Sequence, residues 1–326
     1  MRALIFTDVN NAVSARLIQS TLDLATTRGD LEVCGVVTSR PERFRLDRVQ
    51  AARRFIRRLL VAATNHDVSF GTVPACTIDL ARLERERGIP LLVPDGGDPN
   101  DPRFVAQVSR ELRPHVALSF ECLSLFRGPL LSVFEQAVNY HSGLIPRYRG
   151  VMATSFSVFA GETESGFTFH RMTERVDDGP ILAQGSVPVA GATAADVELR
   201  KLDRAIASLP RVLDAIVANE PGVPPVGRER PFRVHDWMAL IRVEHPEYTT
   251  AAHLRQRIRA FGVVNLTIEG LEHPVTRLRP ARPGQAGAFV TADGQLLAPD
   301  RFAGLPRLLY RLSFGSARYW RRSQLP

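Results

Sequence analysis

The chain has 326 residues, of which 44% are hydrophobic and 23% charged, and its formal net charge is +8. This length is long for one compact domain and suits two, and the composition is typical of a folded globular protein, which excludes a disordered chain. No apolar run approaches the roughly 18 residues that a membrane-spanning helix needs, so a membrane protein is excluded as well.

The basic charge and the cysteines bear on partners and compartment. A positive surface attracts anions such as phosphate or RNA, although an arginine-rich composition without a binding role explains the charge equally well. Cys34, Cys76 and Cys122 are widely spaced and form no metal-ligating pattern, so we expect reduced thiols and no bound metal. The first residues lack a secretory signal, which predicts a cytoplasmic protein with no membrane partner.

The first two thirds of the chain alternate between short apolar runs and segments with helical spacing. Predicted strands are residues 2–7, 31–38, 89–93, 116–120 and 137–141, and predicted helices are 12–25, 79–87 and 104–112. This alternation predicts an α/β fold with a mostly parallel, Rossmann-like sheet and helices on both faces. In such sheets ligands bind beyond the carboxyl ends of the strands.

A long insertion, residues 40–77, interrupts this alternation. Within it, residues 46–60 place apolar side chains on one helical face and arginines largely on the other. An RNA-binding or membrane-surface helix is one interpretation. We favour a helix that packs on the sheet and leaves its charged face in solvent.

The last third of the chain predicts a second, smaller domain. A helix at 195–219 closes the first domain, and the Pro/Gly-rich residues 221–227 form a linker or extended crossing segment. A helix at 251–261 and short strands at 265–268, 275–278, 287–291 and 295–297 follow. We therefore expect domains at 1–220 and 221–326, the second a β-rich, OB-like barrel. Its basic amphipathic tail, 306–326, either covers its own domain, which we favour, or binds RNA or an acidic carrier.

The strand predicted at 137–141 ends in an amide and an imidazole. Asn139 and His141 lie two residues apart, so an extended chain points both side chains to one face. After a second strand-like run, 166–172, Asp177 could return beside His141. An amide, an imidazole and a carboxylate together can support proton-coupled acyl transfer to an amine. No Walker-type loop or GxGxxG motif is present, which argues against a dinucleotide enzyme.

These residues resemble the signature of the folate-dependent formyltransferase family, whose members include methionyl-tRNA and sugar-amine formyltransferases. The resemblance rests on Asn139-x-His141, on Leu144-Ile145-Pro146 and on Asp177-x-Gly179. It implies an enzyme of one-carbon metabolism that uses 10-formyltetrahydrofolate as co-substrate, with Asn139, His141 and Asp177 as its catalytic residues. An ordinary trans peptide bond is expected before Pro146.

The resemblance also implies which residues line the site. Cofactor contacts are expected from Phe120, Glu121, Cys122, Leu123, Leu144, Ile145, Pro146, Asp178 and Gly179, and substrate contacts from Ser142, Arg147 and His170. The sequence departs from the family in two places. Ser142-Gly143 replaces the usual order of glycine or proline before serine, and Glu121 stands where members tend to carry a small, glycine-containing loop.

The chemistry of each catalytic residue type fits formyl transfer. The Asn139 amide can donate a hydrogen bond to the oxyanion of a tetrahedral intermediate. His141 can polarise the carbonyl and relay a proton, and Asp177 can orient the imidazole. The sequence offers no GxSxG elbow or Cys/His pair to act covalently, so direct attack by the acceptor amine is expected.

Three functions remain open. We favour transfer of the formyl group to a primary amine or hydroxylamine of a small molecule, such as an amino sugar or a specialised metabolite. The reason is that residues 149–155 depart from the sequence usual in tRNA enzymes. The alternatives are methionyl-tRNA formylation, with tRNA as partner, and a catalytically silent folate- or RNA-binding protein. The oligomeric state stays open, with a homodimer as one alternative.

Overall fold

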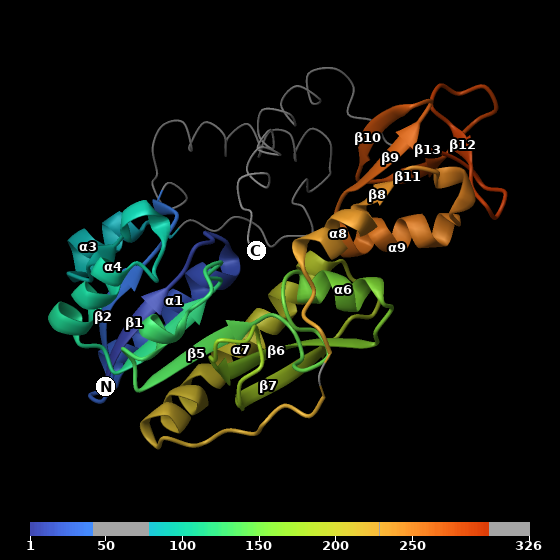
Figure 1. The fold of residues 1–326 in the computed structure, drawn as a ribbon. Coiled ribbons are helices and arrows are strands. Elements are labelled where there is room, and N and C mark those ends of the chain that lie inside the picture. Colours follow the sequence, from blue (N-terminus) through green and yellow to red (C-terminus); the bar gives the residue numbers. More distant parts are fainter. Residues whose placement is uncertain (42–77, 228, 300–326) are drawn as a thin grey trace. The chain divides into compact units, whose positions relative to one another are not determined.

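The structure is a computed structural model, and it describes residues 1–41, 78–227 and 229–299 (Figure 1). The predicted helix at 46–60 and the tail at 306–326 lie outside these residues. The described residues fall into two compact units: the first comprises those up to Ala239 together with Arg259–Phe261, and the second comprises the others. The domain boundary at 220/221 stays a prediction.

A seven-stranded sheet forms the centre of the first unit. Its order is β3-β2-β1-β4-β5-β6-β7, with parallel pairing from β3 to β5 and antiparallel pairing from β5 to β7. The strands are β1 (Arg2–Phe6), β2 (Glu32–Val37), β3 (Leu91–Leu92), β4 (Val116–Phe120), β5 (Gln136–His141), β6 (Glu164–Arg171) and β7 (Ile181–Pro188). The predicted, mostly parallel sheet is therefore confirmed.

Helices connect these strands and cover both faces of the sheet. They are α1 (Ala12–Thr27), α3 (Leu80–Arg87), α4 (Pro102–Gln107), α5 (Gly128–Leu131), α6 (Ala153–Phe159) and α7 (Ala194–Val217), with short helical turns η2 (Asp95–Gly97) and η3 (Val108–Leu112). α1 and α7 pack on one face of the sheet, and α4, η3 and α5 pack on the other. The prediction of helices on both faces is confirmed.

Local sequence signals explain where the main helices begin. Asn11 and Ser14 form a reciprocal capping pair at the start of α1, and Thr193 and Asp196 do the same for α7. Each satisfies backbone N–H groups that the first helical turn leaves unpaired. No helix in the described part of the chain is long and apolar enough to cross a membrane.

The segment after α7 pairs with two other segments of the first unit. Val223 pairs with Ile181 of β7, and Phe232 pairs with Gly150 in an isolated bridge. Residues 221–227 are thus an extended crossing segment, one of the two predicted alternatives. The helix that follows, α8 (Val234–Ile241), was not predicted.

The second unit, taken by itself, is β-rich. It contains β8 (Arg242–Val243), η4 (Pro246–Tyr248), most of α9 (Ala251–Phe261), β9 (Val264–Ile268), β10 (Leu271–Val275), β11 (Leu278–Pro280), β12 (Phe289–Val290) and β13 (Leu296–Pro299). The strands form two three-stranded sheets, β10-β9-β8 and β11-β13-β12. The helix at 251–261 is confirmed, whereas an OB-like barrel is not.

Candidate active site

The candidate site lies at the carboxyl end of β5. Asn139 of β5 pairs with His170 of β6 in the sheet register. Tyr140 points into the core beneath α1 and α7. Because side chains alternate along a strand, Asn139 and His141 share the opposite face. The predicted placement of these two side chains at one strand end is therefore observed.

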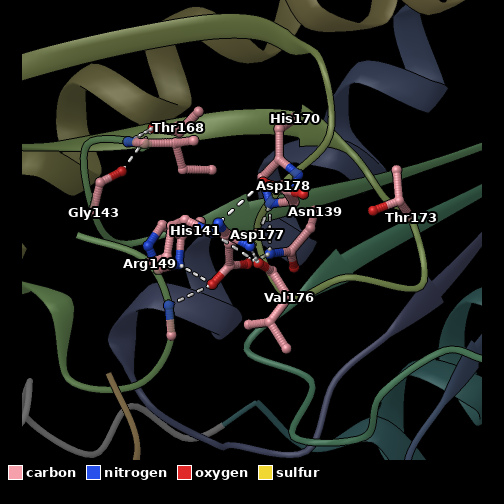
Figure 2. A network of polar contacts seen from close by, with 12 residues as sticks. Asn139, His141, Gly143, Arg149, Thr168, His170, Thr173, Val176, Asp177 and Asp178 are labelled. Atoms are coloured by element: carbon pink, nitrogen blue, oxygen red, sulfur yellow. Dashed lines mark hydrogen bonds and ion pairs between the residues drawn. The ribbon is translucent and has the colours of Figure 1, made fainter. Parts of the chain in front are cut away.

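Asp177 returns to this strand end from the loop between β6 and β7. Its carboxylate lies 3.4 Å from Nδ1 of His141, 3.3 Å from Nε2 of His170 and 3.4 Å from Nδ2 of Asn139. Figure 2 shows these side chains turned toward Asp177. The structure brings together the three predicted catalytic residues and adds His170, which was predicted as a substrate contact.

Hydrogen bonds fix how Asn139 and His170 face the carboxylate. His170 Nδ1 lies 2.9 Å from the backbone oxygen of Arg171, so this nitrogen donates in a neutral ring. In that neutral form Nε2 can accept from the Asn139 amide, 3.2 Å away, whereas a protonated His170 ring donates from Nε2 to Asp177. The second amide hydrogen of Asn139 faces Asp177. An oxyanion could be bound by Asn139 only in exchange for one of these two contacts.

Both ring nitrogens of His141 lie next to oxygen atoms. Nδ1 faces Asp177 and Nε2 faces the backbone oxygen of Tyr148 at 2.5 Å. A neutral imidazole has one N–H and can donate to only one of them, whereas an imidazolium donates to both. Both neighbouring oxygen atoms would therefore be satisfied by the protonated form of His141.

Burial and charge act in opposite directions on this pair. Burial lowers the pKa of His141, and the Asp177 carboxylate and the Tyr148 oxygen oppose that effect. Burial would raise the pKa of Asp177, but His141, His170 and the Gly150 amide together hold it well below its usual range. Near neutral pH the site thus pairs an ionised carboxylate with a mostly neutral imidazole.

The residue after Ser142 must be small because the chain folds tightly around His141. A Cβ atom on Gly143 would lie 2.3 Å from the Tyr148 oxygen and 2.6 Å from His141 Nε2. The serine at 142 uses its backbone oxygen, which accepts hydrogen bonds from Lys201 and Thr154. The exchanged order Ser142-Gly143 therefore places glycine where this loop has no room for a side chain.

Arg147 lies away from the Asp177 network. Its side chain is 65% exposed and pairs with Glu162, which also accepts a hydrogen bond from the Tyr148 hydroxyl. Substrate binding by Arg147 and Ser142 stays a prediction.

The predicted cofactor contacts at residues 120–123 lie at the end of β4, the neighbour of β5, and in the turn after it. Phe120 is buried in the sheet core, and Leu123 is 44% exposed. Asp8 anchors this turn, because its carboxylate accepts from the Leu123 amide at 2.9 Å and from the Cys122 thiol at 3.3 Å. Glu121 has a left-handed backbone, with φ +58°, and accepts from Asn11.

Burial is the main reason that Glu121 titrates far from its usual range. Together with the nearby Glu198 carboxylate, it raises the pKa of Glu121 to about 7. This shift could not be predicted from the sequence, since it depends on burial and on contacts with the N-cap residue of α1 and with residues of α7.

The remaining predicted cofactor contacts lie in two loops. Leu144 and Ile145 follow the Ser142-Gly143 turn, and the Ile145–Pro146 peptide bond is cis, so the expected trans bond was wrong. Asp178 pairs with Arg149 and Arg175, at 3.0 and 3.2 Å. Gly179 packs directly on the backbone of Arg171. Cofactor binding by all these residues stays a prediction.

A buried ion pair beneath the site was missed at the level of sequence. Lys201 of α7 is fully buried, and its ammonium group donates to Glu198 at 3.1 Å, to Ser142 O at 2.8 Å and to the Thr154 hydroxyl. It thus ties α7 to the residue that follows His141. The signal was available, since Lys201 falls on the apolar face of the helix, four residues after Val197.

Arg149 was not among the predicted site residues, yet the structure places it next to Asp177. It is 7% exposed and contacts the residues on both sides of Asp177. Among the described residues, no three His, Cys, Asp or Glu side chains are arranged to hold a metal ion together.

Comparison with known proteins agrees with this geometry. The profile of the family described as formyl transferase matches residues 95–213, which include Asn139, His141 and Asp177. The resemblance of the sequence to the formyltransferase family is confirmed over this stretch. The stretch runs from η2 into α7 and lies within the first unit.

Solved structures share the fold at low sequence identity. A sugar N-formyltransferase from Shewanella sp FDAARGOS_354 is 19% identical, with a TM-score of 0.60, and the match covers 85% of this chain and 97% of that one. A 4-N formyltransferase from Francisella tularensis is 17% identical, with a TM-score of 0.58 and coverage of 85% and 96%. Glycinamide ribonucleotide transformylase 1 from Symbiobacterium toebii is 22% identical, with a TM-score of 0.50 and coverage of 70% and 94%.

Proposed function

We propose that this chain transfers the formyl group of 10-formyltetrahydrofolate to the primary amine of a small molecule, and that an amino sugar is the acceptor. The observation that carries the proposal is the convergence of Asn139, His141, His170 and Asp177 at one strand end. The family match over residues 95–213 and the sugar N-formyltransferase fold of a structural relative support it.

The reaction forms one C–N bond and breaks another. The neutral acceptor amine attacks the formyl carbon, and the resulting tetrahedral intermediate expels N10 of the folate. The products are the N-formylated amine and tetrahydrofolate, so the proton lost by the amine balances the proton gained by N10. No redox step or covalent enzyme intermediate is needed.

The side chains of the site match the demands of these steps. The Asn139 amide can exchange its contact with Asp177 or His170 for the developing oxyanion. Asp177, which is ionised near neutral pH, can accept the amine proton directly or through water. His141 has an oxygen atom next to each ring nitrogen, so it can hold a proton in transit and return it to the leaving nitrogen.

An acceptor panel tests the proposal. Purified protein is incubated with 10-formyltetrahydrofolate and nucleotide-linked amino sugars, simple hydroxylamines or initiator methionyl-tRNA, and mass spectrometry detects the added formyl group. Product with amino sugars supports the proposal, and product with tRNA alone would replace it with the tRNA alternative. Folate binding without product from any acceptor would favour the silent binding protein.

A salt series separates tRNA recognition from adventitious attraction to a basic chain. Binding driven by phosphate contacts weakens steeply as ionic strength rises. Sugar-amine turnover that persists at a salt concentration which abolishes tRNA binding would leave the small-molecule acceptor as the assignment.

A further inference from the structure

The side chain of Arg149 contacts the backbone on one side of Asp177 in the sequence and a side chain on the other. Its Nε donates to the backbone oxygen of Val176 at 3.0 Å, and Nη2 donates to the same oxygen. Its Nη1 lies 3.0 Å from the Asp178 carboxylate. Arg149 therefore contacts the residue before Asp177 and the residue after it, as Figure 2 shows.

The next residue along the chain contacts Asp177 itself. The Gly150 amide donates to Oδ2 of Asp177 at 2.7 Å. Asp177 has a left-handed backbone, with φ +46°, which is unfavourable for a residue other than glycine and persists where neighbouring contacts enforce it. Arg149 and Gly150 supply such contacts on three consecutive residues.

Residues 229–232 hold this arginine from its other side. Arg149 Nη1 donates to the Glu229 backbone oxygen at 3.2 Å, and the Phe232 amide donates to the Arg149 backbone oxygen at 2.8 Å. A Cβ atom on Gly150 would lie 2.2 Å from the Phe232 oxygen, so only glycine fits there. The Phe232 ring stacks on Phe156 with centroids 3.9 Å apart. The arginine is thus fixed at its backbone and at its tip.

We propose that Arg149 and Gly150 are a positioning pair that holds the Asp177 carboxylate in register with His141 and His170. One carboxylate oxygen receives the Gly150 amide and faces His141, and the other faces His170 and Asn139. Without the pair, the carboxylate could turn and leave one imidazole without its partner. The inference rests on the proposed function for its effect on turnover, but its geometric content can be tested without a substrate.

The chain offers a matched control, because a second arginine contacts the Asp178 carboxylate from the surface. Arg175 pairs with Asp178 at 3.2 Å, and its side chain is 75% exposed, against 9% for Arg149. Arg149→Lys keeps the charge but cannot donate in a planar fork to Val176 and Asp178 together. Arg175→Ala removes only the exposed partner, whose contribution is expected to be small.

Both variants are compared with the full-length wild type by two measurements. Steady-state kinetics separate kcat from the KM of the amine, and NMR of labelled histidines follows the titration of the imidazoles. Asp177 faces His141 and His170, Arg149 and Asp178 lie beside it, and the Lys201 ammonium group also acts on His141. In Arg149→Lys we expect kcat to fall about 10- to 100-fold with little change in KM, as misplacement of a catalytic group does.

The NMR readout does not depend on activity. Asp177 opposes the effect of burial on His141, so a loosened carboxylate should move the pKa of His141 further down in Arg149→Lys. Arg175→Ala should match the wild type in both measurements. A folded Arg149→Lys variant with wild-type kcat and wild-type imidazole titration would overturn the proposal.

A milder variant covers the case in which Arg149→Lys does not fold, which circular dichroism would reveal. Asp178→Asn removes one contact of Arg149 and leaves the two bonds to Val176, and we expect a smaller loss in the same direction. A folded Asp178→Asn protein indistinguishable from Arg175→Ala would then overturn the inference. If the wild type forms no formylated product at all, the proposed function fails, while the imidazole titrations still decide on the positioning pair.

Discussion

Nδ1 of His141 lies 3.4 Å from Oδ2 of Asp177, and both side chains are largely shielded from solvent. Two titratable groups in such a contact change each other's pKa. Burial makes the imidazolium unfavourable, and the carboxylate partly compensates. The carboxylate therefore stays ionised near neutral pH and can stabilise a proton that His141 takes up during the proposed reaction.

Removing the charge of Asp177 should abolish most of the turnover. Asp177→Asn keeps the size of the side chain but can neither accept the amine proton nor stabilise a charged imidazole. We expect kcat to fall by about 10² to 10⁴, the range for loss of a general acid or base. The control is Asp203→Asn, an exposed carboxylate that pairs with Arg16. Release of tetrahydrofolate at the wild-type rate by Asp177→Asn would remove this residue from the mechanism.

The raised pKa of Glu121 predicts a pH-dependent gain in stability when its charge is removed. In the folded protein its pKa is about 7, whereas an unfolded glutamate titrates near 4.5. Stability that depends on the neutral carboxyl is present in full below pH 4.5 and is lost as the pH rises toward 7. Glu121→Gln should therefore match the wild type at pH 4 and exceed its free energy of unfolding by roughly 1 to 3 kcal/mol at pH 8.

Urea unfolding at several pH values measures this difference. Asn11 can still donate to the amide oxygen of the glutamine, so hydrogen bonding is largely kept. A constant difference between the two proteins from pH 4 to 8 would show that Glu121 does not titrate in this range.

We expect the loss of Lys201 alone to destabilise the fold more than the loss of both charges of the Lys201–Glu198 pair. Lys201→Met leaves the Glu198 carboxylate buried without its cation and removes a donor from Ser142, so we expect a loss of about 3 to 5 kcal/mol. The double variant with Glu198→Gln should recover a good part of that loss, because no buried charge remains. Chemical denaturation of the two single variants and the double variant completes the cycle, and additive losses would contradict the coupling.

Strong local signals explain which parts of the fold the sequence predicts. β1, β2, β4 and β5 are apolar runs bounded by turns, and their alternation with helices is enough to infer the parallel sheet. β7 was missed because Gln184, Gly185 and Ser186 interrupt its apolar pattern. Its place depends on pairing with β6, which is a tertiary relationship.

A turn signal explains an error in the second unit. A strand was predicted at 275–278, whereas β10 spans Leu271–Val275 and pairs with β9. Glu269 and Gly270 between them both have positive φ, the geometry of a two-residue hairpin turn. The glycine was available as a signal, but glutamate is an unusual first residue for such a turn.

The residues of the candidate site also divide into those that could be predicted from the sequence and those that could not. Asn139 and His141 follow from the period of a strand, and Asp177 from its spacing in the motif. The contacts of Arg149 could not be inferred, because an arginine that donates to backbone oxygens is indistinguishable in sequence from one that lies in solvent. His170 became part of the network through the register of β6 against β5.

The space around Gly143 gives the last prediction. A methyl group there would lie within 2.6 Å of His141 Nε2 and 2.3 Å of a backbone oxygen, distances at which the loop must shift. We expect Gly143→Ala to lower the free energy of unfolding by about 1 to 3 kcal/mol, as overpacking does. It should also lower kcat, because the shift displaces the imidazole. The matched control is Gly29→Ala, where an added Cβ meets nothing within 4 Å. Thermal melting and kinetics of the two alanine variants measure both effects. Wild-type kcat in Gly143→Ala would mean that the loop adapts without moving His141, and that this glycine serves folding alone.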